Sequence, residues 1–178
     1  MKSTTLAATA FALLISTSAF AQSVGEKTGV NSTLGVSPTT ADFVKEAAMS
    51  DMTEIEASKL AQQRGNAAEK TFARQMITDH TETSGELRTM APGNAKTVLP
   101  ETLDSSSQDK IDKLKNAKPD DFSSDFDAMQ VSAHKDAVSL FERYAKGGDD
   151  PKLKDWAAKT LPTLQHHLEM AQNLGKTK

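Results

Sequence analysis

The sequence predicts an all-α protein, a four-helix bundle in which a long crossover carrying a short helix separates two helical hairpins. Two observations lead to this prediction. Helix-forming residues such as Ala, Leu, Met, Lys, Glu and Gln are common, whereas aromatic residues make up 5% of the chain. Apolar residues recur at three- and four-residue steps in four long segments, and no stretch alternates in the manner of a strand.

Residues 1–21 are predicted to be a secretory signal peptide that is not part of the fold. Lys2 supplies the positive start, residues 6–15 form a short apolar run, and Ala-Phe-Ala at 19–21 is a cleavage site before Gln22. The run is too short to span a bilayer as a helix of the mature protein. Because the chain has no cysteine, no lipid anchor is expected. The mature protein is expected to be periplasmic or secreted.

The domain is expected to span residues 40–175, after a flexible leader at 22–39 that is rich in Gly, Ser, Thr and Val. The first helix is predicted over 40–64, where Gly65-Asn66 ends it, and the second over 67–91. So short a turn makes these two helices an antiparallel hairpin.

The second half of the domain follows a crossover of about 28 residues, a length typical of a long bundle crossing. Residues 105–116 are expected to form a short surface helix within it. The third long helix is predicted over 120–146, before Gly147-Gly148, and the fourth over 151–174, with Pro151 in its first turn.

Each long helix carries a polar side chain of a metal-ligating type on its apolar face: Glu54, His80, His134 and His167. Residues equally far from a hairpin turn lie level with each other. Glu54 lies eleven residues before Gly65 and His80 fifteen after it, a mismatch of roughly 6 Å at 1.5 Å per residue. Asp51 matches the height of His80 better.

These residues predict one metal site of three imidazoles and a carboxylate, with Asp51, Asp79 and Gln130 as alternates or as partners that orient the ligands. The ligand set suits Zn, Fe, Mn or Cu and does not choose among them. The alternative is a metal-free structural or interaction domain whose buried histidines are hydrogen-bonded. A third hypothesis is a metal-dependent oxidoreductase.

Four stretches carry a resemblance to a known family: 53–57 (TEIEA), 76–80 (MITDH), 130–134 (QVSAH) and 161–168 (LPTLQHHL). With them the chain resembles an uncharacterised family of bacterial exported proteins, often labelled "putative outer membrane protein", a domain of unknown function that is predicted to be ferritin-like. The resemblance implies a ferritin-like bundle with inward Glu54, His80, His134 and His167. It implies no established activity.

Di-iron ferritins use Glu-x-x-His on two helices. The residues three before the candidate histidines are Ile77, Val131 and Leu164, so a two-iron centre with ferroxidase chemistry is not expected. Nucleophile and phosphate-binding motifs are also absent. The sequence therefore favours a binding or stress-protective role over catalysis.

Charge and hydropathy limit the partners of the protein. The net charge is −3, with Lys and Arg dispersed among the acids, so nucleic-acid binding is not expected. No transmembrane segment is expected in the mature chain. No protein partner can be named, and the helices are long enough for a homo-oligomer. If His80 and His134 are neutral in the core, acidification is expected to charge both and to loosen the bundle.

Overall fold

The computed structural model describes residues 24–26, 28–96 and 99–176. These residues form helices and contain no strand, so the predicted all-α class is confirmed. The signal peptide expected at 1–21 lies outside the described residues. No described helix is long and apolar enough to cross a membrane. The helices of the described residues include α2 (Val30–Leu34), α3 (Thr40–Arg64), α4 (Ala67–Met90), α5 (Gly93–Lys96), α6 (Ser105–Asn116), α7 (Pro119–Gly147) and α8 (Pro151–Leu174).

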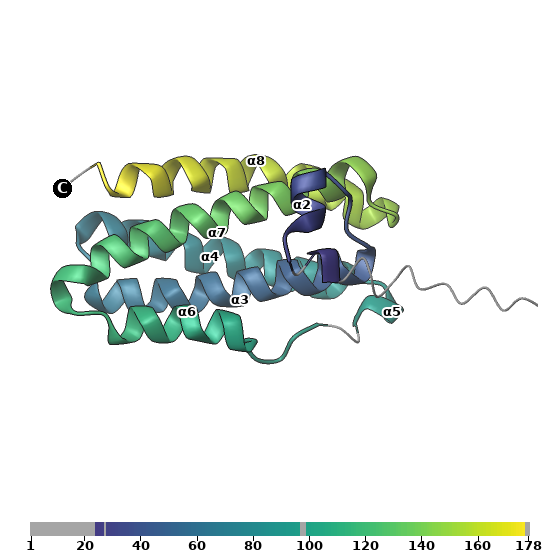
Figure 1. Cartoon of the computed structure of the whole chain (residues 1–178). Helices are drawn as coiled ribbons and strands as arrows, with labels where there is room; N and C mark the ends of the chain where they lie inside the picture. Colours follow the sequence, from purple (N-terminus) through teal and green to yellow (C-terminus); the bar gives the residue numbers. More distant parts are fainter. Residues whose placement is uncertain (1–23, 27, 97–98, 177–178) are drawn as a thin grey trace, which may run out of the picture.

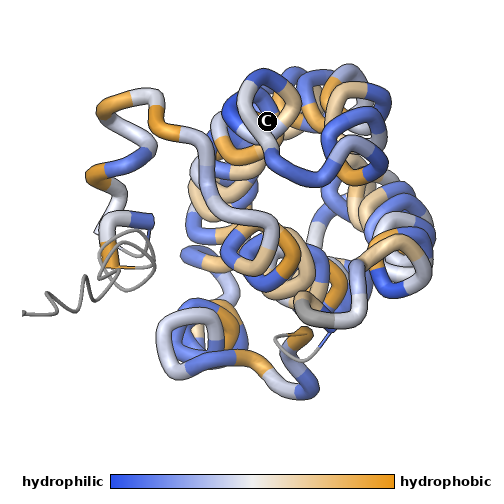
Figure 2. The backbone as a smooth tube through the Cα atoms, turned by 90° about the vertical axis from the view of Figure 1, so that its right-hand side faces the viewer, coloured by the Kyte–Doolittle hydropathy of each residue, from blue (hydrophilic) through white to orange (hydrophobic). Residues whose placement is uncertain are grey.

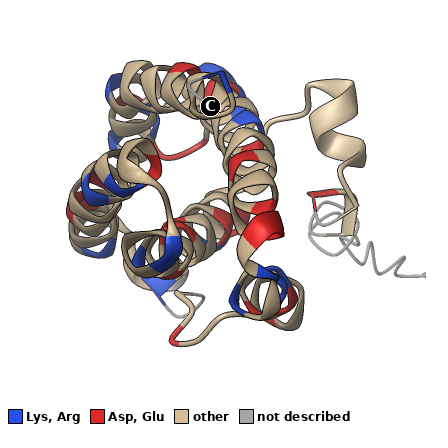
Figure 3. Ribbon diagram, turned by 90° about the vertical axis from the view of Figure 1, so that its left-hand side faces the viewer, with Lys and Arg blue, Asp and Glu red and all other residues tan. Residues whose placement is uncertain are grey.

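The four long helices lie side by side (Figure 1) and, viewed along their length, surround a common axis (Figures 2 and 3). Helix α3 packs against α4 and α7, and α8 packs against α7 and α4. The crossover returns along the outside of α3, where α6 packs, so α7 starts at the end of the molecule where α3 finishes. As a result α4 and α7 run in the same direction.

The predicted bounds of the four long helices agree with the structure to within one residue, because their ends carry strong local signals. The Thr39 side chain accepts from the backbone N–H of Asp42 at the start of α3. Asn66 and Glu69 form a reciprocal capping box at the start of α4. Asp150 caps α8, and Pro151 occupies its first turn.

The core consists of two apolar clusters at opposite ends of the long helices. Around Phe43, the first cluster includes Tyr144, whose ring stacks on Phe43 with centroids 3.9 Å apart. The second includes Phe72 and Phe126 in an edge-to-face contact. Each long helix carries at least one buried polar residue between the residues of these two clusters, among them Asp51, His80, His134 and His167. The centre of the molecule is therefore polar and closed at both ends by apolar side chains.

Part of the expected flexible leader is regular structure. Helix α2 lies between Gly29 and Gly35, which have φ angles of 75° and 66°. It packs on α7, and Ser32 is hydrogen-bonded to Ser139 at 2.9 Å. Arg143 on α7 pairs with Glu26 and donates to the carbonyl of Val36 at 2.7 Å. Contacts between positions more than a hundred residues apart leave no local pattern, so the sequence does not reveal this helix.

One side chain of α3 makes several contacts with the end of the crossover. Arg64 donates to the backbone carbonyls of Leu114, Lys115 and Ala117, at 2.5, 2.8 and 2.5 Å. Its guanidinium also lies 4.5 Å from the ring centre of Phe122. These bonds satisfy carbonyls at the end of α6 that have no partner within that helix. The four-residue helix α5, also in the crossover, was not expected from the sequence.

Candidate metal centre

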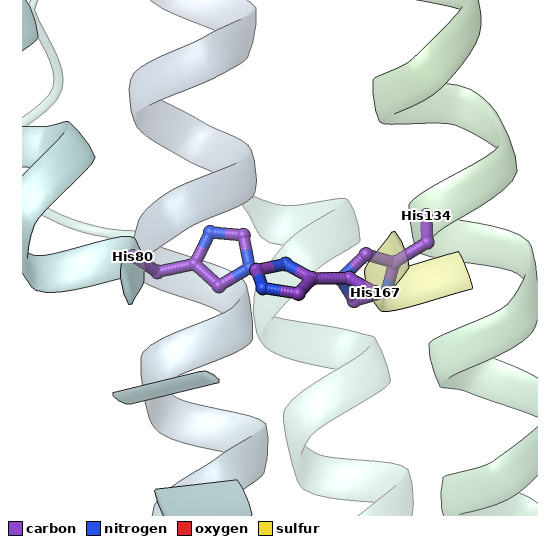
Figure 4. A group of neighbouring side chains, drawn as sticks. All are labelled: His80, His134 and His167. Atoms are coloured by element: carbon purple, nitrogen blue, oxygen red, sulfur yellow. The ribbon is translucent and has the colours of Figure 1, made fainter. Parts of the chain in front are cut away.

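Three imidazole rings from three different helices meet at the centre of the molecule (Figure 4). His80 comes from α4, His134 from α7 and His167 from α8, and each residue is at most 2% exposed. The ring centroids are 5.5 to 5.7 Å apart, close to an equilateral triangle. One ligand atom from each residue lies within 4.8 Å of those of the others. We call these three residues the histidine cluster.

Each ring of the histidine cluster has one nitrogen hydrogen-bonded to an oxygen acceptor. The bonds are His80 Nδ1 to Asp51 Oδ1 at 2.8 Å, His134 Nδ1 to the backbone carbonyl of Gln130 at 2.9 Å, and His167 Nε2 to Asp79 Oδ2 at 2.8 Å. An acceptor requires the proton on the nitrogen that faces it, so in the neutral ring the other nitrogen carries the lone pair.

The second nitrogen of each ring is buried and has no hydrogen-bond partner. These atoms are Nε2 of His80, Nε2 of His134 and Nδ1 of His167. One nitrogen bonded to a carboxylate or carbonyl and the other free is the arrangement of metal-ligating histidines, because the acceptor fixes the tautomer and the ring orientation. The cluster therefore offers three oriented imidazole donors to one cation.

Asp51 is held in place from α4, the helix that carries its histidine partner. Its second oxygen accepts hydrogen bonds from Thr83 at 3.0 Å and Ser84 at 3.1 Å. The structure thus places Asp51 level with His80, as the distances from the turn indicate. The contribution of Thr83 and Ser84 was missed, since small polar residues on a helix carry no directional signal. The signal that could have found them was Asp51 itself, because a buried carboxylate on α3 requires hydrogen-bond donors from a neighbouring helix.

Asp79 has a more exposed position than Asp51. Its side chain is 20% exposed and accepts from Gln75 on the same helix as well as from His167. Asp79 and His167 line a surface groove of about 510 Å³ between α4 and α8. The full lining is Gln75, Asp79, Pro162, Thr163, His166, His167 and Met170. The groove connects solvent to the outer edge of His167. His166 itself is exposed, as the helical spacing predicts.

The surroundings shift the three imidazoles in different directions. Burial lowers the pKa of His134 to about 4, and the nearby His80 acts in the same sense. Burial also lowers the pKa of His167 to about 4, although the bond to Asp79 opposes it. Burial would lower the pKa of His80 too, but the hydrogen bond and charge of Asp51, together with the charges of Glu54 and Asp79, raise it overall. The expectation that His80 and His134 respond alike to acid is therefore wrong for His80, which holds its proton more tightly than a free imidazole.

Glu54, the predicted fourth ligand, is 1% exposed but lies outside the group of mutually close ligand atoms. Burial raises the pKa of its carboxyl, and the charge of His80 and the side-chain amide of Gln130 lower it in part. No well-aligned hydrogen bond reaches either of its oxygens. The sequence analysis correctly predicted that Glu54 and Gln130 are buried near the histidine cluster. A ligand role for Glu54 stays a prediction.

Fold and site define an all-helical protein with a buried cluster of three oriented histidines that could hold a metal ion. The chain belongs to the family described as a domain of unknown function, DUF4142, whose model matches residues 25–174. No curated protein and no solved structure matches the chain. The family match starts ahead of residue 40 and so includes α2 and its contacts with α7.

Proposed function

We propose that this protein is an exported, ferritin-like four-helix bundle that binds one transition-metal ion through His80, His134 and His167, in a stress-protective or metal-binding role. The observation that carries the proposal is the set of three free imidazole nitrogens, one on each ring. Leaving three buried nitrogens without partners destabilises a fold. A metal ion satisfies all three at once.

The ferritin-like part of the proposal is supported by the order and direction of the long helices. Two antiparallel hairpins are joined by a crossover that runs the length of the molecule, so that α4 and α7 are parallel. Ferritin-like bundles have one such crossover. Export is supported by the signal peptide that the first 21 residues predict.

The donor set narrows the range of metals. Imidazole suits Zn²⁺, Cu²⁺ and Fe²⁺, whereas Mn²⁺ is better served by carboxylate and water oxygens. With Glu54 outside the close group, the donors are nitrogen, and Mn²⁺ becomes the weakest of the four candidates. A buried site needs an entry path for the ion, and the groove lined by Asp79 and His167 is the candidate for it.

The test is the metal content of the mature chain, produced from Gln22 onward without a histidine tag and without chelators. We expect about one equivalent of a transition metal by elemental analysis, as a single three-imidazole site requires. His167→Ala should abolish it, and His166→Ala should leave it unchanged. The two variants remove neighbouring imidazoles, one buried and one exposed, so the pair separates a specific site from nonspecific binding by histidine.

A metal-free wild-type protein that cannot be reconstituted with Zn²⁺, Cu²⁺ or Fe²⁺ would refute the proposal. The metal-free interaction domain would then be the better account, and the pairing of His80 with Asp51 favours it in that case. Circular dichroism of His167→Ala is needed as a control, because loss of metal counts only if the helices persist.

A further inference from the structure

A second group of buried polar side chains lies beside the histidine cluster. Glu54 is 1% exposed, and Ser58 and Gln130 are fully buried. Five of their side-chain atoms make no well-aligned hydrogen bond: both carboxyl oxygens of Glu54, the hydroxyl of Ser58, and the oxygen and nitrogen of the Gln130 amide. The Gln130 amide is nevertheless close enough to Glu54 to lower the pKa of its carboxyl. We call these three residues the Glu54 group. Buried polar atoms that lack partners are rare in folded proteins. A group of three residues that contains five such atoms therefore requires an explanation.

Glu54 and Gln130 lie about one helical turn from the histidines, and Ser58 lies one turn further along α3. Gln130 precedes His134 by four residues on α7, and its backbone carbonyl accepts from that ring. The side chain of Gln130 and the charge of His80 both lower the pKa of Glu54, so all three lie close together. Ser58 follows Glu54 by one turn on α3 and shares its face.

The surroundings restrict what can bind there. Met76 and Ala171 lie one turn from His80 and His167, and both are buried within the apolar cluster that contains Phe126. On the other helices the layer that holds the Glu54 group is therefore apolar. A ligand must be small, must both donate and accept hydrogen bonds, and must bond to α3 and α7. Water and other water-sized oxygen ligands meet these conditions, and buried water bound to about three polar atoms is a normal part of protein structure.

We propose that the Glu54 group binds a water-sized oxygen ligand, and that this ligand occupies the coordination position left open by His80, His134 and His167. The second clause rests on the proposed function. Three protein ligands with an open position characterise reactive metal sites, whereas structural sites are closed by a fourth protein ligand. In this arrangement Ser58 and Gln130 hold the ligand, and Glu54 bonds to it instead of to the metal.

The experiment uses the mature protein loaded with Co²⁺, whose visible absorption reports its ligands, and azide as the probe for the open position. Azide should change the spectrum to saturation. Gln130→Leu should keep the bound Co²⁺ but weaken azide binding about tenfold, as expected for one lost hydrogen bond near the ligand. Thr53→Val is the matched control, since Thr53 is buried on α3 but its hydroxyl bonds to the carbonyl of Met49.

Two results would overturn the inference: no spectral response to azide, or equal azide affinity in Gln130→Leu and Thr53→Val. Loss of Co²⁺ in Glu54→Gln would also overturn it, because that result makes Glu54 a metal ligand. If the wild type binds no metal at all, the proposed function fails separately. A crystal structure of the metal-free protein then decides whether the Glu54 group binds a water-sized ligand. An ordered water bonded to both Glu54 and Gln130 supports such binding, and the absence of this water refutes it.

Discussion

Two buried polar sites of this protein differ in how their polar atoms are hydrogen-bonded. One lies at an end of the long helices, and the other lies at their centre. At the end, the hydroxyl of Tyr144 is 2.6 Å from that of Thr40, which also donates to Asp149 at 2.6 Å. The backbone N–H groups of Thr40 and Asp150 complete this network. At the centre, three imidazole nitrogens and the five atoms of the Glu54 group have no partner.

This difference is the one expected between a site that stabilises the fold and the metal-binding site proposed above. Satisfied buried hydrogen bonds contribute to stability, whereas unsatisfied ones cost about 1–3 kcal/mol per group. Tyr144 and the three histidines are all buried, so burial alone does not distinguish the two sites. The Tyr144 network joins the start of α3 to the α7–α8 turn and needs no further ligand. Under the proposal, the central site is completed by a metal ion and a small ligand.

The largest effect is expected from acid on the central histidines of the metal-free protein. The pKa of His134 and that of His167 are about 4 in the fold, below the ordinary 6.5. The unfolded chain therefore takes up protons first. The stability that each contributes is complete above about pH 6.5 and declines as the pH falls toward 4. At about 1.4 kcal/mol per pKa unit, the loss is at most about 3.5 kcal/mol per imidazole.

His80 and Glu54 act in the opposite sense, because the fold raises the pKa of each. Their contributions are present at low pH and are lost as the pH rises through the folded value. Because these opposing contributions overlap in the wild type, the effect of His134 is isolated by comparing the wild type with a variant that lacks this imidazole. Between pH 7 and pH 4.5, the advantage of wild type over His134→Gln in urea unfolding should shrink by about 2 kcal/mol. The exposed His166→Gln should parallel wild type, and a parallel His134→Gln would show that His134 titrates normally.

The next effect concerns the acid that orients His80. Asp51→Asn removes the negative charge that makes His80 a better donor, and the affinity for Zn²⁺ should fall 10- to 100-fold, as for other partners of ligating histidines. Competition with a chromophoric chelator measures this change. Glu56→Gln serves as the control on the same helix, because its side chain is 46% exposed and pairs with Lys59. Equal affinities in the two variants would mean that Asp51 stabilises the centre without tuning it.

Features that depend on local signals could be predicted from the sequence, and those that depend on contacts across the fold could not. Helix bounds were predictable because Gly65, Asn66 and Pro151 act locally. The inward histidines were predictable because each occupies an apolar arc, and Asp51 was matched to His80 by counting from the turn. Ser58 and the Thr83–Ser84 pair were not found, since a small polar residue fits either face of a helix. The pairing of Glu26 with Arg143 depends on contacts across the fold, which no local pattern contains.

The smallest effect is also the most direct test of the comparison, because two removals of buried polar atoms should differ in outcome. Tyr144→Phe deletes a partnered hydroxyl and leaves the N–H of Asp150 without its acceptor, so the free energy of unfolding should fall by about 1–2 kcal/mol. Gln130→Met deletes two unpartnered atoms from an equally buried site. Its stability in the metal-free protein should be unchanged or higher, because polar residues kept for binding are not optimised for folding. Urea unfolding of both variants at pH 7 gives the comparison. Equal losses would show that the central polar atoms stabilise the fold as those around Tyr144 do, and the division between the two sites would not stand.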